Sequence, residues 1–391
     1  YARGAATGTQ DHIGGLVGWN NEGRIYHAYS TGVVTGRTFV GGLVGRSDSG
    51  IITYSYWDKD ASGRDKSTVG EGKTTEEMKQ QVTFANWDFN TIWNIDGSTN
   101  DGYPFLTIFA GGSGTKEDPY LVATAEQLNN VRYRLNKHFK QTANIDLNVA
   151  PYNTGAGWEP IGIYGSPFSG TFDGNGKTIS NLTINRSANY SVGLFGYSSN
   201  TAEMQNVKME NTNVTGGNNT GALVGDNRAT ITNSYAKGAV TGTGFCAGGL
   251  VGYNYKASIS DSYATGTVAG SKRVGGLVGE NWGTITNSNA TGTVTGSAYV
   301  GGLVGYNALA TISGSYTTGT VNGQQFTGGL VGDNCGTITK SSATGDVTGT
   351  GNYVGGLVGY NQQNYSIADS YATGTVVGKQ STGGLVGENW G

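Results

Sequence analysis

Carboxyl and phenol side chains alternate at one position of a motif that repeats along the second half of the chain. The position is occupied in turn by Asp226, Tyr253, Glu280, Tyr306, Asp333, Tyr360 and Glu388. If successive motifs stack as strands, the carboxylates lie two strand spacings apart, roughly 10 Å. An inverting glycosidase uses two carboxylates about 6.5–9.5 Å apart. The alternative is structural, because an intervening Tyr keeps like charges off adjacent strands, and the regularity of the column favours it.

Aromatic side chains close to the same motif could bind carbohydrate. Tyr253, Tyr306 and Tyr360 belong to the alternating column, and Trp282 and Trp390 each follow an acid by two residues. Exposed rings on a flat face can stack on sugar rings, so these five residues are the candidate carbohydrate-binding residues. A second aromatic set recurs elsewhere in the repeat at Tyr29, Tyr235, Tyr263, Tyr316 and Tyr371. Rows of stacked Tyr also stabilise a sheet without any ligand, so both interpretations stay open.

Other catalytic and ligand-binding patterns are missing from the sequence. His12, His27 and His138 are the three histidines, and they form no HExxH zinc motif. No Ser/His/Asp set, phosphate-binding loop or Cys-x-x-Cys pair is recognisable. The turns at 58–60, 96–101 and 173–175 offer oxygen atoms to Ca²⁺ but lack the spacing of a calcium loop. We therefore predict no catalytic residues, no metal site and no cofactor.

The composition narrows the class of protein. Of the 391 residues 69 are Gly, only 13% are charged, and the formal net charge is -3. This charge gives no basic footprint for nucleic acid, and no run of about 18 apolar residues exists that could span a bilayer. Regularly spaced Gly in a chain of such low charge argues against a disordered linker.

The motif Gly-Gly-Leu-Val-Gly-x-Asn sets the period of the chain. Its Leu recurs at Leu16, Leu43, Leu250, Leu277, Leu303, Leu330, Leu357 and Leu385, with looser copies around Leu194 and Leu223. A period of about 27 residues is typical of stacked repeats, whose short apolar segments bury a face only when coils lie in register. We predict an all-β fold, a parallel β-helix with short capping helices, and a right-handed one because parallel crossovers nearly always are.

Two residue types in the repeat are assigned structural roles. Asn follows the alternating position at Asn20, Asn227, Asn254, Asn281, Asn307, Asn334, Asn361 and Asn389, which predicts a ladder of side-chain amides along the stack. Gly is expected at corners or where backbones approach closely. Cys246 and Cys335 lie about three coils apart, roughly 14 Å at the usual strand spacing, so both are predicted to be free.

The repeat is interrupted once, and the interruption divides the chain into modules. Residues 1–110 hold two coils and a closing cap, with a short helix from Thr74 and aromatic side chains that plug the open end of the stack. Residues 111–189 form the opening cap of a second module, with an amphipathic helix from Thr124 to about Leu135. Residues 190–391 form the main solenoid.

The sequence resembles a known family. GGLVGxNxGxI followed by SYATGxVxG is similar to the GLUG repeat of bacterial surface and secreted proteins, over residues 12–57 and 190–391. The stretches GTKEDPYLVATAEQLNNV and FSGTFDGNGKTISNLTI resemble segments that open such a β-helix, and SYWDKDASG resembles one that closes it. The resemblance implies a β-helix fold and a surface location. Some relatives are metallopeptidases, but their HExxH motif has no counterpart here.

These observations lead to one main functional expectation and one alternative. We expect a secreted or cell-surface protein with a structural or adhesive role and no enzymatic activity. Its expected partners are other copies of itself, docked head to tail into filaments or a tandem array, and surface glycans, because sheet edges at solenoid ends can pair. The alternative is a polysaccharide-active enzyme or carbohydrate-binding module on the same scaffold.

Overall fold

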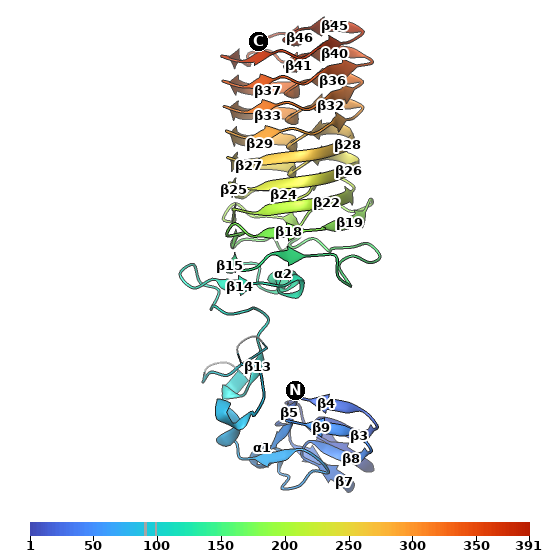
Figure 1. The fold of residues 1–391 in the computed structure, drawn as a ribbon, viewed down its shortest axis with the longest axis vertical. Coiled ribbons are helices and arrows are strands. Elements are labelled where there is room, and N and C mark those ends of the chain that lie inside the picture. Colours follow the sequence, from blue (N-terminus) through green and yellow to red (C-terminus); the bar gives the residue numbers. More distant parts are fainter. Residues whose placement is uncertain (90–91, 98–99) are drawn as a thin grey trace. The chain divides into compact units, whose positions relative to one another are not determined.

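The computed structural model describes residues 1–89, 92–97 and 100–391. The chain divides into two compact units, Tyr1–Ala110 and Gly111–Gly391, and each is built mainly from short parallel strands stacked in coils (Figure 1). Stacked coils bury apolar side chains that no single coil could bury alone.

The first unit begins with two coils in register. Its strands are β1 (Ala6–Thr7), β2 (Asp11–Gly14), β3 (Val17–Asn21), β4 (Arg24–Tyr26), β5 (Tyr29–Ser30), β6 (Val34–Thr35), β7 (Thr38–Gly41), β8 (Val44–Asp48), β9 (Ile51–Thr53), β10 (Tyr56–Asp58), β11 (Glu71–Lys73), β12 (Trp93–Asn94) and β13 (Phe105–Leu106). Strands β2, β3 and β4 pair in parallel with β7, β8 and β9, and each residue pairs with the one 27 positions later. The period seen in the sequence is therefore one turn of the solenoid.

A cap of short helices and aromatic side chains closes the first unit. The helices are α1 (Lys59–Ser62) and the 3₁₀ turns η1 (Glu77–Lys79), η2 (Gln81–Thr83) and η3 (Asn100–Gly102). The predicted capping box is present, because Thr74 and Glu77 exchange hydrogen bonds between side chain and backbone; the helix it begins is one 3₁₀ turn. The buried cluster consists of Tyr29, Tyr56, Met78, Phe84, Trp87, Trp93 and Tyr103, with Phe89 packed against it.

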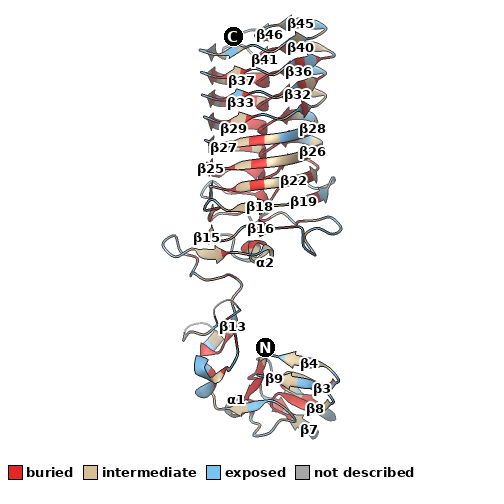
Figure 2. Ribbon diagram, viewed as in Figure 1, coloured by how far each residue is buried: buried red, intermediate tan, exposed pale blue. Residues whose placement is uncertain are grey.

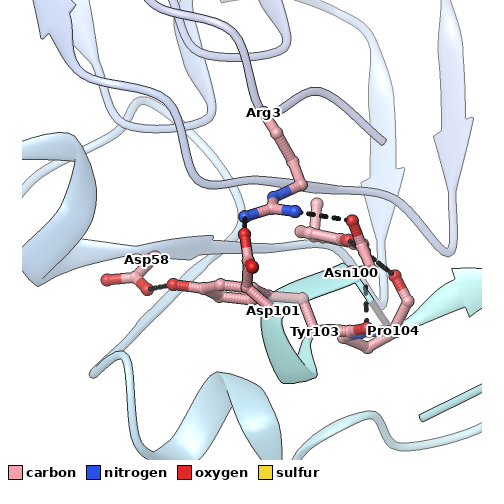
Figure 3. Close-up of polar contacts among 7 residues, drawn as sticks. Arg3, Asp58, Asn100, Asp101, Tyr103 and Pro104 are labelled. Atoms are coloured by element: carbon pink, nitrogen blue, oxygen red, sulfur yellow. Dashed lines mark hydrogen bonds and ion pairs between the residues drawn. The ribbon is translucent and has the colours of Figure 1, made fainter. Parts of the chain in front are cut away.

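Polar contacts fix the cap to the coils (Figure 3). Asp58, fully buried, accepts hydrogen bonds from the Tyr103 hydroxyl and the Thr75 hydroxyl, both at 2.7 Å, and from the Ala61 amide at the start of α1. Arg3 donates to the side chains of Asn100 and Asp101 at 2.7 and 2.6 Å. The turn at 58–60 is thus a helix cap whose carboxylate is already used by neutral donors.

The second unit opens with a cap of strands and one helix. Its elements are β14 (Tyr120–Val122), α2 (Ala125–Asn130), the 3₁₀ turn η4 (Val131–Tyr133), β15 (His138–Gln141), β16 (Ile145–Asp146), β17 (Thr171–Asp173), β18 (Thr178–Ser180) and β19 (Thr183–Arg186). The Thr124 hydroxyl caps α2 by accepting from the Gln127 amide, and Leu128 and Val131 are fully buried. The helix therefore covers the core at the start of the stack.

The coils of the second unit contribute to two continuous sheets. The first sheet continues through β20 (Phe195–Tyr197), β21 (Glu203–Gln205), β24 (Val224–Asn227), β25 (Thr230–Thr232), β27 (Val251–Ser260), β29 (Val278–Thr286), β33 (Val304–Ser313), β37 (Val331–Thr339), β41 (Val358–Asn361), β42 (Ile367–Ala368) and β46 (Val386–Asn389). Pairing is parallel, and partner residues in these strands lie 26 to 29 positions apart, as in Val278 with Val304 and Ile338 with Ile367. This confirms the predicted all-β parallel solenoid of about 27 residues per coil.

The second sheet runs along the rest of each coil. After β16, β18 and β19 it contains β22 (Lys208–Gly216), β23 (Thr220–Gly221), β26 (Tyr235–Gly248), β28 (Tyr263–Gly275), β30 (Asn289–Ala290), β31 (Val294–Thr295), β32 (Ala298–Gly301), β34 (Tyr316–Thr317), β35 (Val321–Gly323), β36 (Gln325–Gly328), β38 (Ser342–Ala343), β39 (Val347–Gly349), β40 (Asn352–Gly355), β43 (Tyr371–Ala372), β44 (Val376–Val377) and β45 (Gln380–Gly383). Buried residues recur at matching places in successive coils (Figure 2). Leu250, Leu277, Leu303, Leu330 and Leu357 are fully buried.

The glycines of the repeated motif lie against the backbone of neighbouring coils. A Cβ on Gly276 would sit 2.1 Å from the Gly302 carbonyl oxygen, and one on Gly279 would sit 2.6 Å from the backbone of Cys246. These distances are shorter than any real carbon–oxygen or carbon–carbon contact, so only Gly fits. The predicted close backbone approach is confirmed.

Candidate functional site

The alternating acids and tyrosines form one continuous column, here called the acid–tyrosine column. Each member pairs in register with the next along the first sheet, from Asp226 with Tyr253 to Tyr360 with Glu388. Neighbouring acids are therefore two coils apart, and a Tyr lies between them. The column is regular, and the question is whether its acids are open to a substrate.

Three of the four acids are buried and hold protein partners, and Glu388 in the last coil is partly exposed. Asp226, Glu280 and Asp333 are only 7%, 4% and 4% exposed. The Glu280 carboxylate pairs with the Arg273 guanidinium, accepts from the Trp282 indole N–H at 2.7 Å and contacts the Cys246 thiol at 3.1 Å. A buried carboxylate needs such donors to be tolerated. This geometry ties a corner of one coil to the strands beside it.

Two of the acids are incompletely compensated. Burial raises the pKa of Asp333 to about 6, although Gln362 donates to both carboxylate oxygens at 3.0 and 3.1 Å. Burial likewise raises the pKa of Asp226 to about 6, because the Arg228 guanidinium approaches its carboxylate only to 3.6 Å. Desolvation disfavours the charged form unless a close cation or several donors offset it.

These raised pKa values predict that the unfolding free energy falls as the pH rises. The carboxyl of Asp333 has a pKa near 6 in the folded chain against a model value of 3.8, so the folded state holds the extra proton between about pH 4 and 6. Asp333→Asn should stabilise the protein by about 1–3 kcal/mol at pH 7.5 and change little at pH 3.5. Thermal denaturation at the two pH values measures this difference.

The control for this prediction is Asp261→Asn at an exposed corner, which should leave the pH dependence as it is. The titratable neighbours of Asp333 include Cys335, Tyr306 and Tyr360, and the pKa values of all three are raised, mainly by burial. They stay neutral throughout the window. Equal stabilisation of Asp333→Asn at both pH values would show that charge burial is not the cause.

A second column, which the sequence did not reveal, runs beside the first. Asn219, Cys246, Arg273, Tyr299, Phe326, Tyr353 and Ser381 all have φ between +48° and +64°. The rings of Tyr299, Phe326 and Tyr353 stack at 4.8 and 4.9 Å between centroids. Because aromatic residues rarely adopt positive φ, their residue type does not predict this conformation. The only sequence signal for the column is that each of these rings lies two residues before a Gly-Gly pair.

The candidate carbohydrate-binding tyrosines lie against other side chains. Tyr253 stacks on Tyr255 at 5.9 Å, and the Arg273 guanidinium lies 5.3 Å from the centre of the Tyr306 ring. Tyr360 meets the edges of Phe326 and Tyr353. These three tyrosines are half-buried, and each ring contacts another side chain.

The candidate tryptophans differ from the tyrosines. The indole N–H of Trp390 donates to Glu388 at 2.8 Å, as that of Trp282 does to Glu280. Trp390 is 61% exposed, and Trp282 is half-buried and lines a groove described below. Each Trp therefore bonds to an acid of its own coil. Trp282 lies in β29 and Trp390 follows β46, so the two are in different coils. The structure does not gather the five candidates into one cavity.

Asn side chains form the predicted ladder. Asn227, Asn254, Asn281, Asn307, Asn334, Asn361 and Asn389 are linked by six amide hydrogen bonds of 2.7–2.9 Å, each Nδ2 donating to the Oδ1 of the next coil. Most of these Asn also donate to a carbonyl of their own turn, as Asn334 does to Gly336 at 2.9 Å. In the first unit, Asn20 contacts Ser47 instead of a second Asn. The ladder holds register, and the amides from Asn227 to Asn361 all bond to neighbouring groups.

The second tyrosine set also follows the register. Tyr235 and Tyr263 stack at 4.6 Å, while Tyr316 and Tyr371 are 45% and 57% exposed. Asn289 and Ser342 separate them in the column. Tyr29 belongs to the buried cluster of the first unit.

The remaining polar candidates have structural partners. Asp173 accepts from the Asn175 amide and the Asn206 side chain. Of the turn at 96–101, residues 98 and 99 lie outside the described residues. Within the described part of the chain, no group of three or more His, Cys, Asp or Glu side chains could hold a metal ion. Cys246 and Cys335 are free and buried.

Comparison with known proteins identifies the repeat. Residues 243–269, 270–295, 296–322 and 350–377 match the family model described as the GLUG motif. The chain carries GLUG repeats. The four GLUG copies each span about one coil of the second unit, so the motif corresponds to one turn of the solenoid.

Two relatives each match part of the chain. The chain is 41% identical to halomucin of Haloquadratum walsbyi over 156 residues, which are 38% of this chain and 2% of halomucin. It is 39% identical over 132 residues to a protein of Evansella cellulosilytica described as a candidate Gly-rich membrane protein, covering 32% of this chain and 15% of that protein. The chain thus spans a small part of the length of these relatives.

A solved structure also matches this chain over much of its length. A protein of Bacteroides ovatus described as a candidate immunoglobulin A1 protease superposes with a TM-score of 0.48 and 22% identity, over 70% of this chain and 80% of that one. Within the residues described, no helix is long and apolar enough to cross a membrane.

Proposed function

We propose that this chain is a structural or adhesive β-solenoid segment of an extracellular surface protein. The observation that carries the proposal is the use of the polar residues of the motif between coils. Asn side chains form the amide ladder, and the acids of the acid–tyrosine column are buried against neighbouring side chains. Side chains whose types could act in catalysis are instead bonded to neighbouring coils.

The relatives support the location. One is named halomucin and another is described as a membrane protein, and both names fit a protein at the cell surface. A repeat solenoid suits such a place because each added coil extends the structure without a larger core. We infer no enzymatic activity, since the acids of the column offer a substrate little exposed oxygen.

Surface labelling of cells tests the proposed location. An antibody raised against the chain should label intact cells of the organism that produces it, and protease added outside intact cells should remove the epitope. Permeabilisation should add little signal. Label that appears only after permeabilisation would overturn the proposal.

We also propose that copies associate head to tail. Support comes from the strand register, which is the same in the two units. In the first unit β3 pairs with β8, in the second β41 pairs with β46, and both pairings run through the Val of the repeated motif. A coil of one copy therefore carries an edge pattern that suits a coil of another. Sedimentation velocity over a range of concentrations should show species that grow with concentration. A single monomeric species at all concentrations would rule this association out.

A further inference from the structure

A groove crosses four coils of the first sheet in the second unit. It has a volume of about 410 Å³, and its lining includes Arg228, Lys256, Trp282, Gly283, Thr284 and Leu309. It lies outside the amide ladder and beside the acid–tyrosine column. Neither the fold nor the GLUG match assigns it a role.

The groove arises from a difference in length between alternate coils. Strands β27 and β33 each carry one residue more than β29 at the turn after the ladder Asn, and the register shifts there. The extra residues include Lys256 and Leu309, both exposed and with φ of 52° and 50°. Between them β29 has Gly283, which carries no side chain. The residues around Lys256 and Leu309 therefore form the two sides of the groove, and Gly283 lies on its floor.

The charged side chains that line the groove are both cationic, and the acids that contact Arg228 and Trp282, which are Asp226 and Glu280, are buried. Arg228 and Lys256 are among the lining residues, and no Asp or Glu is. The Arg228 guanidinium is held between the rings of Tyr197 and Tyr255, at 5.1 and 4.8 Å from their centroids. Its side chain keeps 35% exposure. In a chain of net charge -3, a groove lined by cations alone favours an anionic ligand.

A row of hydroxyls and one indole complete the groove. Thr230, Ser258, Thr284 and Thr311 pair in register along four coils, a length of about 14 Å at the usual strand spacing. Among the described residues, the Thr284 and Thr311 hydroxyls have no hydrogen-bond partner, and Thr230 and Ser258 contact only each other. Hydroxyls in a row with an indole at one side match the alternating polar edges and apolar faces of a sugar chain.

We propose that this groove binds an acidic oligosaccharide, a chain of sugars that carry carboxylates. Arg228 and Lys256 pair with carboxylates of the ligand, Thr284 and Thr311 hydrogen-bond to sugar hydroxyls, and Trp282 packs on a sugar face. The proposal rests on the adhesive part of the proposed function and names its ligand class. Nucleic acid is the competing polyanion, and two cations with a single indole suit it less well.

Calorimetric titration of the full chain with oligogalacturonate tests this assignment. The matched ligand is the fully methyl-esterified oligomer, which keeps the sugar hydroxyls and removes the charges. We expect the acid form to bind at least about tenfold more tightly than the ester, and the difference to shrink at high salt. Single-stranded DNA should bind more weakly than the acidic oligosaccharide.

Variants locate the binding on the protein. Lys256→Glu should weaken binding about five- to tenfold, because an attractive charge becomes a repulsive one, and Trp282→Ala about tenfold. The matched control is Lys340→Glu, which changes an exposed Lys that also has positive φ but lies outside the groove. It should stay within twofold. If Trp282→Ala disturbs the fold, as judged by circular dichroism, Thr284→Asp introduces a carboxylate into the groove and should weaken binding similarly.

Each outcome decides the assignment. Equal affinity for acid and ester, tighter binding of DNA, equal effects of Lys256→Glu and Lys340→Glu, or no binding at all would overturn it. Such a failure leaves the surface-labelling result untouched, so it separates the groove from the proposed location. Loss of surface labelling with intact oligosaccharide binding would instead overturn the location alone.

Discussion

Gly276→Ala is expected to destabilise the second unit by at least about 3 kcal/mol, because overpacking against rigid backbone cannot be relieved by a rotamer change. The new Cβ would lie 2.1 Å from the Gly302 carbonyl oxygen and 2.8 Å from the Ala290 Cβ. Relief requires neighbouring coils to separate, and that breaks the parallel hydrogen bonds on both sides. Urea denaturation followed by far-UV circular dichroism measures the loss.

The matched control is Gly384→Ala. Gly384 holds the same position in its copy of the motif, yet a Cβ there meets nothing within 4 Å. This variant should change the free energy of unfolding by no more than about 0.5 kcal/mol. Equal losses in both variants would mean that the glycine serves local backbone conformation and not the approach of coils.

Asn281→Ala is expected to cost about 2–5 kcal/mol, because it removes one hydrogen bond from each of two buried partners. Asn254 loses the acceptor for its Nδ2, and Asn307 loses the donor to its Oδ1. All three side chains are fully buried, so water cannot replace the lost bonds. Chemical denaturation of the full chain again provides the measurement.

Two further variants sharpen the test of the ladder. Asn281→Asp keeps the shape but replaces a donor by an acceptor facing the Asn307 oxygen, so it should be as damaging as Asn281→Ala near neutral pH. Asn289→Ala in the same coil alters a half-exposed side chain and should cost no more than about 0.5 kcal/mol. A mild effect of Asn281→Ala, equal to that of Asn289→Ala, would contradict the ladder as a source of stability.

The periodic features of this chain could be predicted from its sequence because each stacked coil repeats the same contact. One register fixes the neighbours of every Asn in the ladder and of every member of the acid–tyrosine column. Spacing alone therefore identified which residues meet, as with Asn281 and Asn307. It also identified the glycines that the next coil touches.

The non-periodic features could not be predicted in the same way. The pairing of Arg273 with Glu280 depends on a backbone corner with positive φ at Arg273, and Arg has no preference for that conformation. The groove beside Trp282 depends on single extra residues at Lys256 and Leu309, a difference that reads in the sequence as ordinary variation of repeat length. An irregularity of this kind involves only a few residues, so the repeat pattern does not predict it. Locating it requires the three-dimensional register of the coils.

The central claim is that the Asn residues and the acids of the repeated motif hold coils together and do not form an open site. A crystal structure of the full chain, at a resolution that places side-chain amides and carboxylates, tests it most directly. We predict one unbroken row of amide hydrogen bonds from Asn227 to Asn389, with Asp226, Glu280 and Asp333 buried beside it. Asn side chains turned to solvent, or these acids facing an open cleft, would contradict the account.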